Sequence, residues 1–167
     1  MDYGNLDNGE ARASRTVAGL SLKGRALRLL AAREQSRVEL ERKLAAHAES
    51  PEQLALLLDE LEAKDFISEA RVAESVVNRR QAKLGASRIR QELQGKGLDA
   101  ELVLQTLEYL KATEFERARE VWRKKFDLKS SAPADAAAHA KQMRFLAARG
   151  FGGDVIRRVV CQERDES

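Results

Sequence analysis

The stretch SRIRQELQGKGLDAELVLQTL, Ser87–Leu107, has a second, altered copy in KQMRFLAARGFGGDVIRRVV, Lys141–Val160. A shift of 53 positions superimposes the two copies. It places Leu93 on Leu146, Lys96 on Arg149, Gly97 on Gly150 and Leu98 on Phe151. A shift of 49 positions brings the earlier part of the chain onto the same pattern, with Leu40 on Ile89 and Leu44 on Leu93. The unit therefore occurs three times, and each copy is about 50 residues long.

Each copy has the apolar periodicity and the helix start and stop signals expected for three helices. Ser36 with Glu39 forms a capping box, and Asp99 stands where an N-cap is needed. Gly97 and Gly150 each follow a last helical turn and precede an apolar residue, which predicts a left-handed C-terminal cap. We predict helices that begin at Lys23, Ser36, Ser50, Ser68, Ala86, Asp99, Thr113, Asp135 and Gly152. The fourth of them is expected to run to the break at Gly85 with Leu84 facing inward.

The predicted fold class is all-α, with three tandem three-helix repeats that form an elongated, curved array. A three-helix unit of this size buries little apolar area alone, so stacked units must share their cores. The clearest loop is Lys129–Pro133. The predicted organisation is a disordered tail at 1–20, repeats at 21–67, 68–112 and 113–163, and a polar tail at 164–167.

Composition limits the class of protein. The net charge is +3 and the isoelectric point is near 9.1, which allows contact with nucleic acid without requiring it. The single cysteine, Cys161, rules out an intramolecular disulfide and favours a reducing compartment. No apolar run reaches the length of a membrane span, and the first residues lack the pattern of a signal peptide. We therefore expect a soluble cytoplasmic protein.

Charge is distributed unevenly along the chain. Positions 49–74 hold eight acidic and two basic residues, whereas positions 79–96 hold six basic residues and one acidic residue. Such a basic flank suits a phosphate backbone or an acidic protein groove, although solvated helix faces with local ion pairs remain the alternative. The candidate residues facing a filament or DNA are Arg79, Arg80, Lys83, Arg88, Arg90, Lys96, Arg123, Lys124, Lys125, Arg144, Arg149, Arg157 and Arg158.

No residue pattern indicates catalysis. His47 and His139 lack metal-ligand spacing, and Cys161 follows two valines as a buried apolar residue would. We expect no enzyme, no metal site and no cofactor. A helix-turn-helix DNA reader is the main rival, but acidic residues open most of the helices that would read bases. Only the last helix, with Arg157 and Arg158, suits that role.

Four segments in order resemble the bacterial regulatory protein RecX family. They are SRVELERKL (36–44), LLDELEAKDFIS (57–68), RRQAKLGASRIRQELQGKGLD (79–99) and LAARGFGGDVIRRVV (146–160). The resemblance covers about Lys23 to Cys161. This chain has His47-Ala48-Glu49 where family members often carry a Lys-Gly-Phe type of turn.

The resemblance implies three tandem three-helix repeats and a role as a modulator of the RecA recombinase. Family members bind the filament that RecA forms on single-stranded DNA, lie in its groove, and inhibit filament extension, ATP hydrolysis, strand exchange and co-protease activity. Some also bind DNA directly. We therefore expect RecA filaments and single-stranded DNA as partners, no membrane, and a monomer. A direct DNA-binding protein and a helical adaptor for an unrelated protein remain the alternatives.

Overall fold

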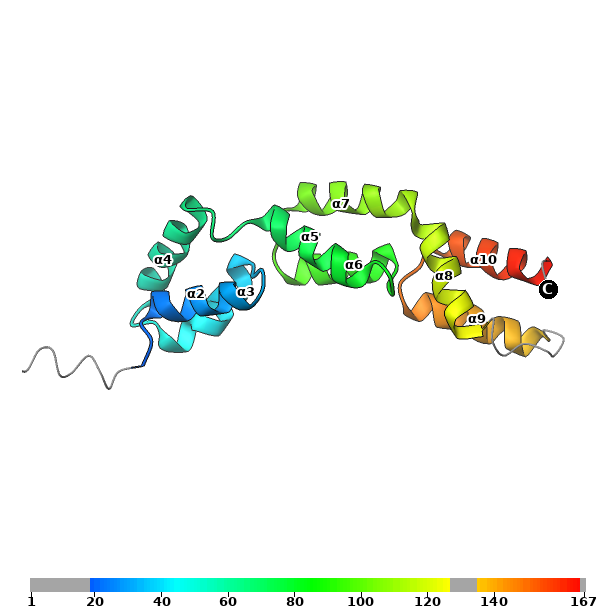
Figure 1. Cartoon of the computed structure of the whole chain (residues 1–167), viewed down its shortest axis with the longest axis horizontal. Helices are drawn as coiled ribbons and strands as arrows, with labels where there is room; N and C mark the ends of the chain where they lie inside the picture. Colours follow the sequence, from blue (N-terminus) through cyan, green and yellow to red (C-terminus); the bar gives the residue numbers. More distant parts are fainter. Residues whose placement is uncertain (1–18, 127–134, 166–167) are drawn as a thin grey trace, which may run out of the picture. The chain divides into compact units, whose positions relative to one another are not determined.

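The computed structural model describes residues 19–126 and 135–165, and these residues form helices joined by short turns (Figure 1). No strand occurs within these two ranges, which confirms the all-α prediction. The predicted loop, most of the predicted N-terminal tail and half of the predicted C-terminal tail lie outside the described residues. The helices are α2 (Leu22–Ala32), α3 (Arg37–Leu44), the short 3-10 helix η1 (Ala45–His47), α4 (Pro51–Ala63), α5 (Glu69–Arg80), α6 (Ala86–Gly95), α7 (Ala100–Ala112), α8 (Glu114–Phe126), α9 (Ala136–Ala148) and α10 (Gly153–Asp165).

The chain divides into two compact units, Met1–Ile67 and Ser68–Ser167. In the first unit, α2, α3 and α4 enclose an apolar cluster that includes the fully buried Leu40, Leu58 and Leu61. The predicted capping box is present at the start of α3. The Ser36 hydroxyl accepts from the Glu39 amide, and the Glu39 carboxylate accepts from the Ser36 amide. Local hydrogen bonds thus fix where α3 begins, and burial of leucines fixes which face packs.

An ion-pair cluster joins the two outer helices of the first unit. Lys23 Nζ of α2 lies 2.7 Å from Glu60 Oε1 of α4, and Lys64 Nζ lies 2.6 Å from the same oxygen. The hydrogen bond from Lys23, with that from Lys64, lowers the pKa of Glu60 to about 2. The site is open to solvent, so dissolved salt screens it.

We expect the Glu60 cluster to stabilise the fold above the unfolded carboxyl pKa of about 4.3 and to lose this effect as the pH falls through about 2. The direction follows because the folded pKa lies below the unfolded pKa. A carbon-detected NMR titration of the Glu60 carboxyl checks the value. Its pKa should return toward about 4.3 in about 1 M salt. An unshifted pKa at low salt would contradict the prediction.

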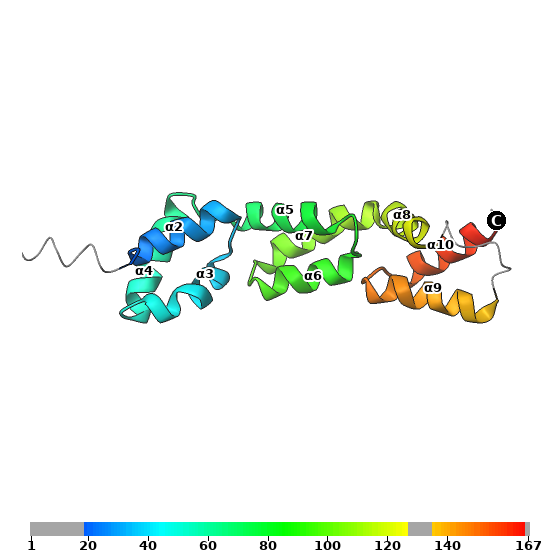
Figure 2. The same ribbon diagram turned by 60° about the horizontal axis from the view of Figure 1, so that its bottom comes forward.

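The second unit contains the two repeated motifs from which the fold was predicted (Figure 2). Helices α5, α6 and α7 share one apolar cluster, centred on Ile89 and Leu93. Helices α8, α9 and α10 share another, which includes Trp122 and Leu146. Both predicted glycine caps are confirmed: Gly97 has φ +70° and Gly150 has φ +83°. The next apolar amide bonds back to the helix in each case, from Leu98 to Leu93 O and from Phe151 to Leu146 O.

The predicted extent of the fourth helix is wrong. Helix α5 ends at Arg80, and the chain turns through Gln81–Leu84 before α6 begins. A distant side chain binds this turn. The Arg117 guanidinium of α8 donates to the carbonyls of Gln81 and Leu84 at 3.0 and 2.8 Å. These bonds satisfy two carbonyl groups of the turn that follows α5, which stabilises the turn without a helix continuing to Gly85.

The expected burial of Cys161 is also wrong, because its side chain is exposed. Val159 and Val160 occupy the buried side of α10, with Ile156 one turn earlier. Each helical residue is rotated by about 100° from the one before it, so the position after two buried valines leaves the buried stripe.

Candidate functional site

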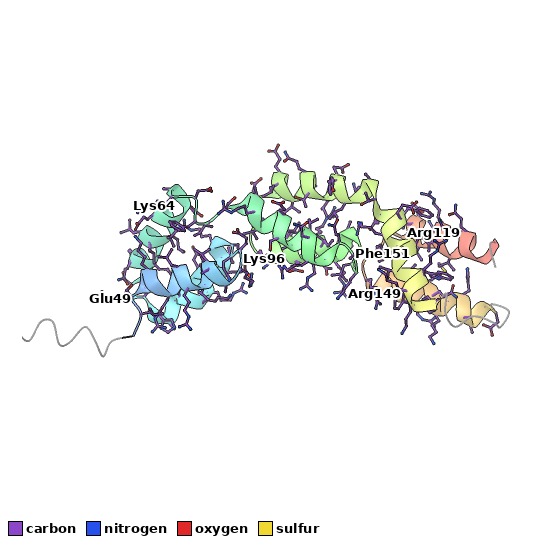
Figure 3. All side chains as sticks on the ribbon, viewed as in Figure 1. Glu49, Lys64, Lys96, Arg119, Arg149 and Phe151 are labelled. Carbon is purple, nitrogen blue, oxygen red and sulfur yellow. The ribbon has the colours of Figure 1, made fainter. Side chains whose placement is uncertain are left out.

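The second and third repeats meet through main-chain atoms at Gly85 and Gly150, a contact we call the glycine junction. The Gly85 amide donates to Arg149 O at 2.9 Å, and the Ser87 amide donates to Gly150 O at 3.2 Å. Figure 3 shows Arg149 and Phe151 on the turn between α9 and α10, beside the start of α6. A side chain at either glycine would collide with the facing chain, since a Cβ on Gly85 would lie 2.3 Å from Gly150 O.

Two charged residues of α8 hold the other side of this contact. Glu114 is buried, and its Oε1 accepts from the Ala86 amide at 2.9 Å, which caps the start of α6. Arg117 donates to Gln81, Leu84 and also Leu110 O, the last at 3.0 Å. Burial lowers the pKa of the Arg117 guanidinium, and the charge of Glu114 opposes that shift. The α5–α6 turn is therefore fixed in place relative to α8.

Beside this turn lies a cationic hollow of about 250 Å³, which we call the α8–α9 hollow. Its apolar wall includes Val121 of α8 and Phe145 of α9. Four basic side chains line it, from the α5–α6 turn, α8 and the end of α9: Lys83, Lys124, Lys125 and Arg149. All four belong to the candidate set that the sequence predicts, and the fold brings them together from positions up to 66 residues apart.

A row of aromatic rings stabilises the wall of the hollow. The Arg149 guanidinium lies 3.6 Å from the centre of the Phe145 ring, and its Nη1 donates to Phe145 O. Phe145 meets Phe126 edge to face at 5.1 Å, and Phe126 meets Trp122 at 5.9 Å. Trp122 is buried, as its spacing on the helix predicts. The packed rings hold Arg149 at the rim of the hollow.

The charge of the hollow is only slightly compensated by carboxylates. Among the described residues, Lys83 and Lys125 have no ion-pair partner, and Arg149 bonds only to a carbonyl and a ring. Lys124 lies 3.6 Å from Glu120, with both side chains more than half exposed. Repulsion among neighbouring cations raises their free energy, and a bound anion relieves it. The hollow is therefore suited to phosphate or carboxylate groups.

The other candidate residues lie outside the hollow. Arg79 and Arg80 are engaged by Glu92 of α6, Arg80 at 2.8 Å. Arg88 donates to Ala148 O and so belongs to the glycine junction. Lys96 is only 9 % exposed, so little of its side chain reaches the surface. Arg90 and Arg144 are exposed, and Arg123 is half-buried.

The last helix carries the two exposed arginines that the sequence suggests for base reading, and each has a partner within the third repeat. Arg157 is paired with Asp154 one turn earlier. The Arg158 guanidinium lies 4.4 Å from the centre of the Phe115 ring. Both arginines are thus engaged within the third repeat, which argues against a base-reading role for this helix.

Sequence reasoning missed Glu114 and Arg117, which position Lys83. No local pattern marks them, because Arg117 bonds to carbonyls 33 and 36 residues earlier. Two kinds of feature are absent from residues 19–126 and 135–165. No helix there is long and apolar enough to cross a membrane, and no three metal-ligating side chains gather.

Comparison with known proteins agrees with this architecture. Sequence profiles described as "RecX, second three-helix domain" and "RecX, third three-helix domain" match residues 68–107 and 112–160. The regulatory protein RecX of Leptothrix cholodnii is 54% identical over 141 residues, which cover 84% of this chain and 88% of the relative. The protein of the same name from Herminiimonas arsenicoxydans is 50% identical over 137 residues, which cover 82% of this chain and 89% of the relative.

The fold is also similar to a solved structure. The crystal structure of RecX from Lactobacillus salivarius superimposes with a TM-score of 0.69 at 23% identity, covering 87% of this chain and 96% of that chain. At this level of identity the structural match shows the fold, while the sequence relatives show the family. The chain therefore belongs to the RecX family of regulatory proteins.

Proposed function

We propose that the chain binds the filament formed by the RecA recombinase on single-stranded DNA and inhibits that filament. It acts as a cytoplasmic monomer, catalyses no reaction, and lowers filament extension, ATP hydrolysis, strand exchange and co-protease activity. Family membership supports the link to RecA. The observation that supports a binding surface is the α8–α9 hollow, where Lys83, Lys125 and Arg149 lack carboxylate partners among the described residues.

The physical basis is charge complementarity. A nucleoprotein filament presents phosphates along a repeating path, and cations held beside a fixed apolar wall meet them at a defined place. Lysines act as point charges toward phosphate and release counterions from DNA when they bind. The bonds from Arg117 keep the lysine of the α5–α6 turn and those of α8 in one arrangement, so little ordering is needed on binding.

The experiment that tests the proposed function is RecA ATP hydrolysis on single-stranded DNA, with this protein added well below the RecA concentration. A substoichiometric fall is expected, because disruption at one place in a filament affects many protomers. Unchanged hydrolysis at equimolar protein would overturn the proposal. Binding to DNA alone, measured against salt, then tests the direct alternative: log affinity should fall linearly with log salt.

Reversing two charges in the α8–α9 hollow should weaken filament binding. We expect Lys83→Glu with Lys125→Glu to lower the affinity for RecA filaments by about tenfold or more, because two attractive contacts become repulsive. Both lysines are exposed and lack described ion-pair partners, so the fold should persist. The measurement is a co-sedimentation or fluorescence binding titration with filaments.

The matched control carries the same charge change at exposed positions outside the hollow. Arg42→Glu with Lys111→Glu should leave filament affinity within about twofold of the parent. Equal losses in the two double variants would show that net charge alone governs binding, and the α8–α9 hollow would then lose its assigned role.

A further inference from the structure

A second cationic hollow lies in the first unit, between α2 and α3, and encloses about 370 Å³. We call it the α2–α3 hollow. Its apolar floor contains Leu20, Leu29 and Leu44, and its basic residues include Arg25, Arg28 and Lys43. The sequence prediction of candidate basic residues includes none of these positions, because it concerned the second and third repeats.

No carboxylate of the described residues neutralises the cations of the α2–α3 hollow. Arg25 Nε donates to Leu20 O at 3.1 Å, and Lys43 Nζ donates to the neutral Gln35 Oε1 at 2.8 Å. Arg28 is exposed and makes no hydrogen bond or ion pair with any described residue. Three positive charges thus surround an apolar floor.

Other basic residues of the same unit behave differently. Lys23, Arg33 and Arg37 each lie within 3.2 Å of at least one carboxylate oxygen. Their partners are Glu60 for Lys23, Glu39 for Arg33, and Glu41, Asp59 and Glu62 for Arg37. Carboxylates of the first unit thus pair these three cations, whereas no described carboxylate pairs the three cations of the hollow. Arg42, an exposed residue outside the hollow, also has no described carboxylate partner.

The repeat register shows that this difference is local. The shifts of 49 and 53 positions align Lys43 with Glu92 and Phe145, and His47 with Lys96 and Arg149. In the second repeat, Glu92 forms ion pairs with Arg79 and Arg80 and so neutralises its own helix face. The first repeat has a lysine at that position instead. The positive charge of the α2–α3 hollow is thus specific to the first repeat and is not shared by the corresponding position of the second.

We propose that the α2–α3 hollow binds an acidic amphipathic peptide segment of a protein partner. An aliphatic side chain of the peptide lies on the leucine floor, and its carboxylates bind Arg25, Arg28 and Lys43. Arginine suits carboxylates because its planar donors match their two oxygens. Among the described residues that line this hollow, the only ring is the imidazole of His47, and there is no Phe, Tyr or Trp. The α8–α9 hollow contains Phe145 instead, and single-stranded nucleic acid binds mainly through stacking on such large rings.

This inference goes beyond the proposed function, because it concerns the chemistry of the bound segment and not the identity of the protein that carries it. Charge complementarity with the uncompensated cations is the feature that selects an acidic segment over a neutral or basic one. The apolar floor selects an amphipathic segment over a purely acidic one.

The test uses the full chain and a labelled short helical peptide with leucine along one face and glutamate along the others. Fluorescence anisotropy should show binding, and NMR shifts should concentrate on α2 and α3. A peptide with lysine in place of glutamate should not bind, and neither should one with serine in place of leucine. RecA is absent from the assay, so its outcome is separate from the filament test.

Arg28→Glu should lower the affinity for the acidic peptide by about fivefold or more, since a favourable charge contact becomes repulsive. The matched control, Arg42→Glu, changes an exposed arginine of α3 that does not line the hollow, and affinity should stay within about twofold. Absence of peptide-induced shifts at millimolar peptide overturns the proposal. A second result would also overturn it: a single-stranded oligonucleotide displaces the peptide, and Arg28→Glu lowers the affinity for the oligonucleotide as much as the affinity for the peptide. The hollow would then be a nucleic-acid site.

Discussion

Replacing Gly85 with alanine should lower the free energy of unfolding by about 3 kcal/mol, because the added methyl overfills a rigid contact. A Cβ at this position would lie 2.3 Å from Gly150 O and 2.4 Å from Phe151 N. The facing atoms are main chain, and the bond from the Gly85 amide to Arg149 O holds them in place. The Gly85 backbone, at φ −79°, is one that alanine adopts readily, so the expected cost is steric.

The control is the same substitution at Gly95, the last residue of α6. Nothing lies within 4 Å of a Cβ built there. Gly95→Ala should leave the stability unchanged or raise it by up to about 1 kcal/mol, because alanine has the higher helix propensity. Urea denaturation followed by circular dichroism compares the two variants. Similar stabilities would show that the glycine junction tolerates a side chain, contrary to the geometry described above.

Removing the charge of Arg117 should have a comparably large effect. Arg117→Met keeps most of the aliphatic stem but leaves the carbonyls of Gln81, Leu84 and Leu110 without this donor. Unsatisfied and partly buried acceptors, with the buried Glu114 deprived of a neighbouring cation, should cost about 3 kcal/mol. The same denaturation experiment measures the loss.

Lys124→Met is the matched control on the same helix, since Lys124 is exposed and its single ion pair with Glu120 is on the surface. Its effect should stay within about 0.5 kcal/mol. Hydrogen exchange adds a local measurement. The amides of Lys83 and Leu84, which bond to Arg80 O, should lose protection in Arg117→Met and keep it in the control. Retained protection would mean that the α5–α6 turn is stable without Arg117.

Local chemistry explains what the sequence predicts correctly. The Ser36 capping box involves residues three apart. Gly97 and Gly150 adopt the left-handed conformation because they have no Cβ, and the apolar residue after each glycine bonds back to the same helix. Such interactions lie within one helical turn, so a short window of sequence contains all the partners. Repetition at shifts of 49 and 53 positions then extends the local pattern to the all-α fold class.

Interactions between distant residues explain what the sequence could not predict. The turn after α5 accepts hydrogen bonds from the distant Arg117, and the burial of Lys96 depends on packing around the turn that carries it. The four basic residues of the α8–α9 hollow were all predicted as candidate binding residues. Their proximity depends on how three segments of the chain pack together, which the sequence does not show. Periodicity states which face of a helix is apolar, but it does not state which exposed cations find a carboxylate.

The glycine junction has a consequence for how such a protein can change over generations. Gly85 and Gly150 meet through atoms that every amino acid shares, and they exclude side chains. Selection on this contact therefore acts mainly by forbidding substitutions at two positions. The cationic side chains of the neighbouring hollow take no part in these main-chain bonds, to which Arg149 contributes only its carbonyl oxygen. These side chains can therefore be exchanged to suit a different partner while the spacing of the two repeats is inherited unaltered.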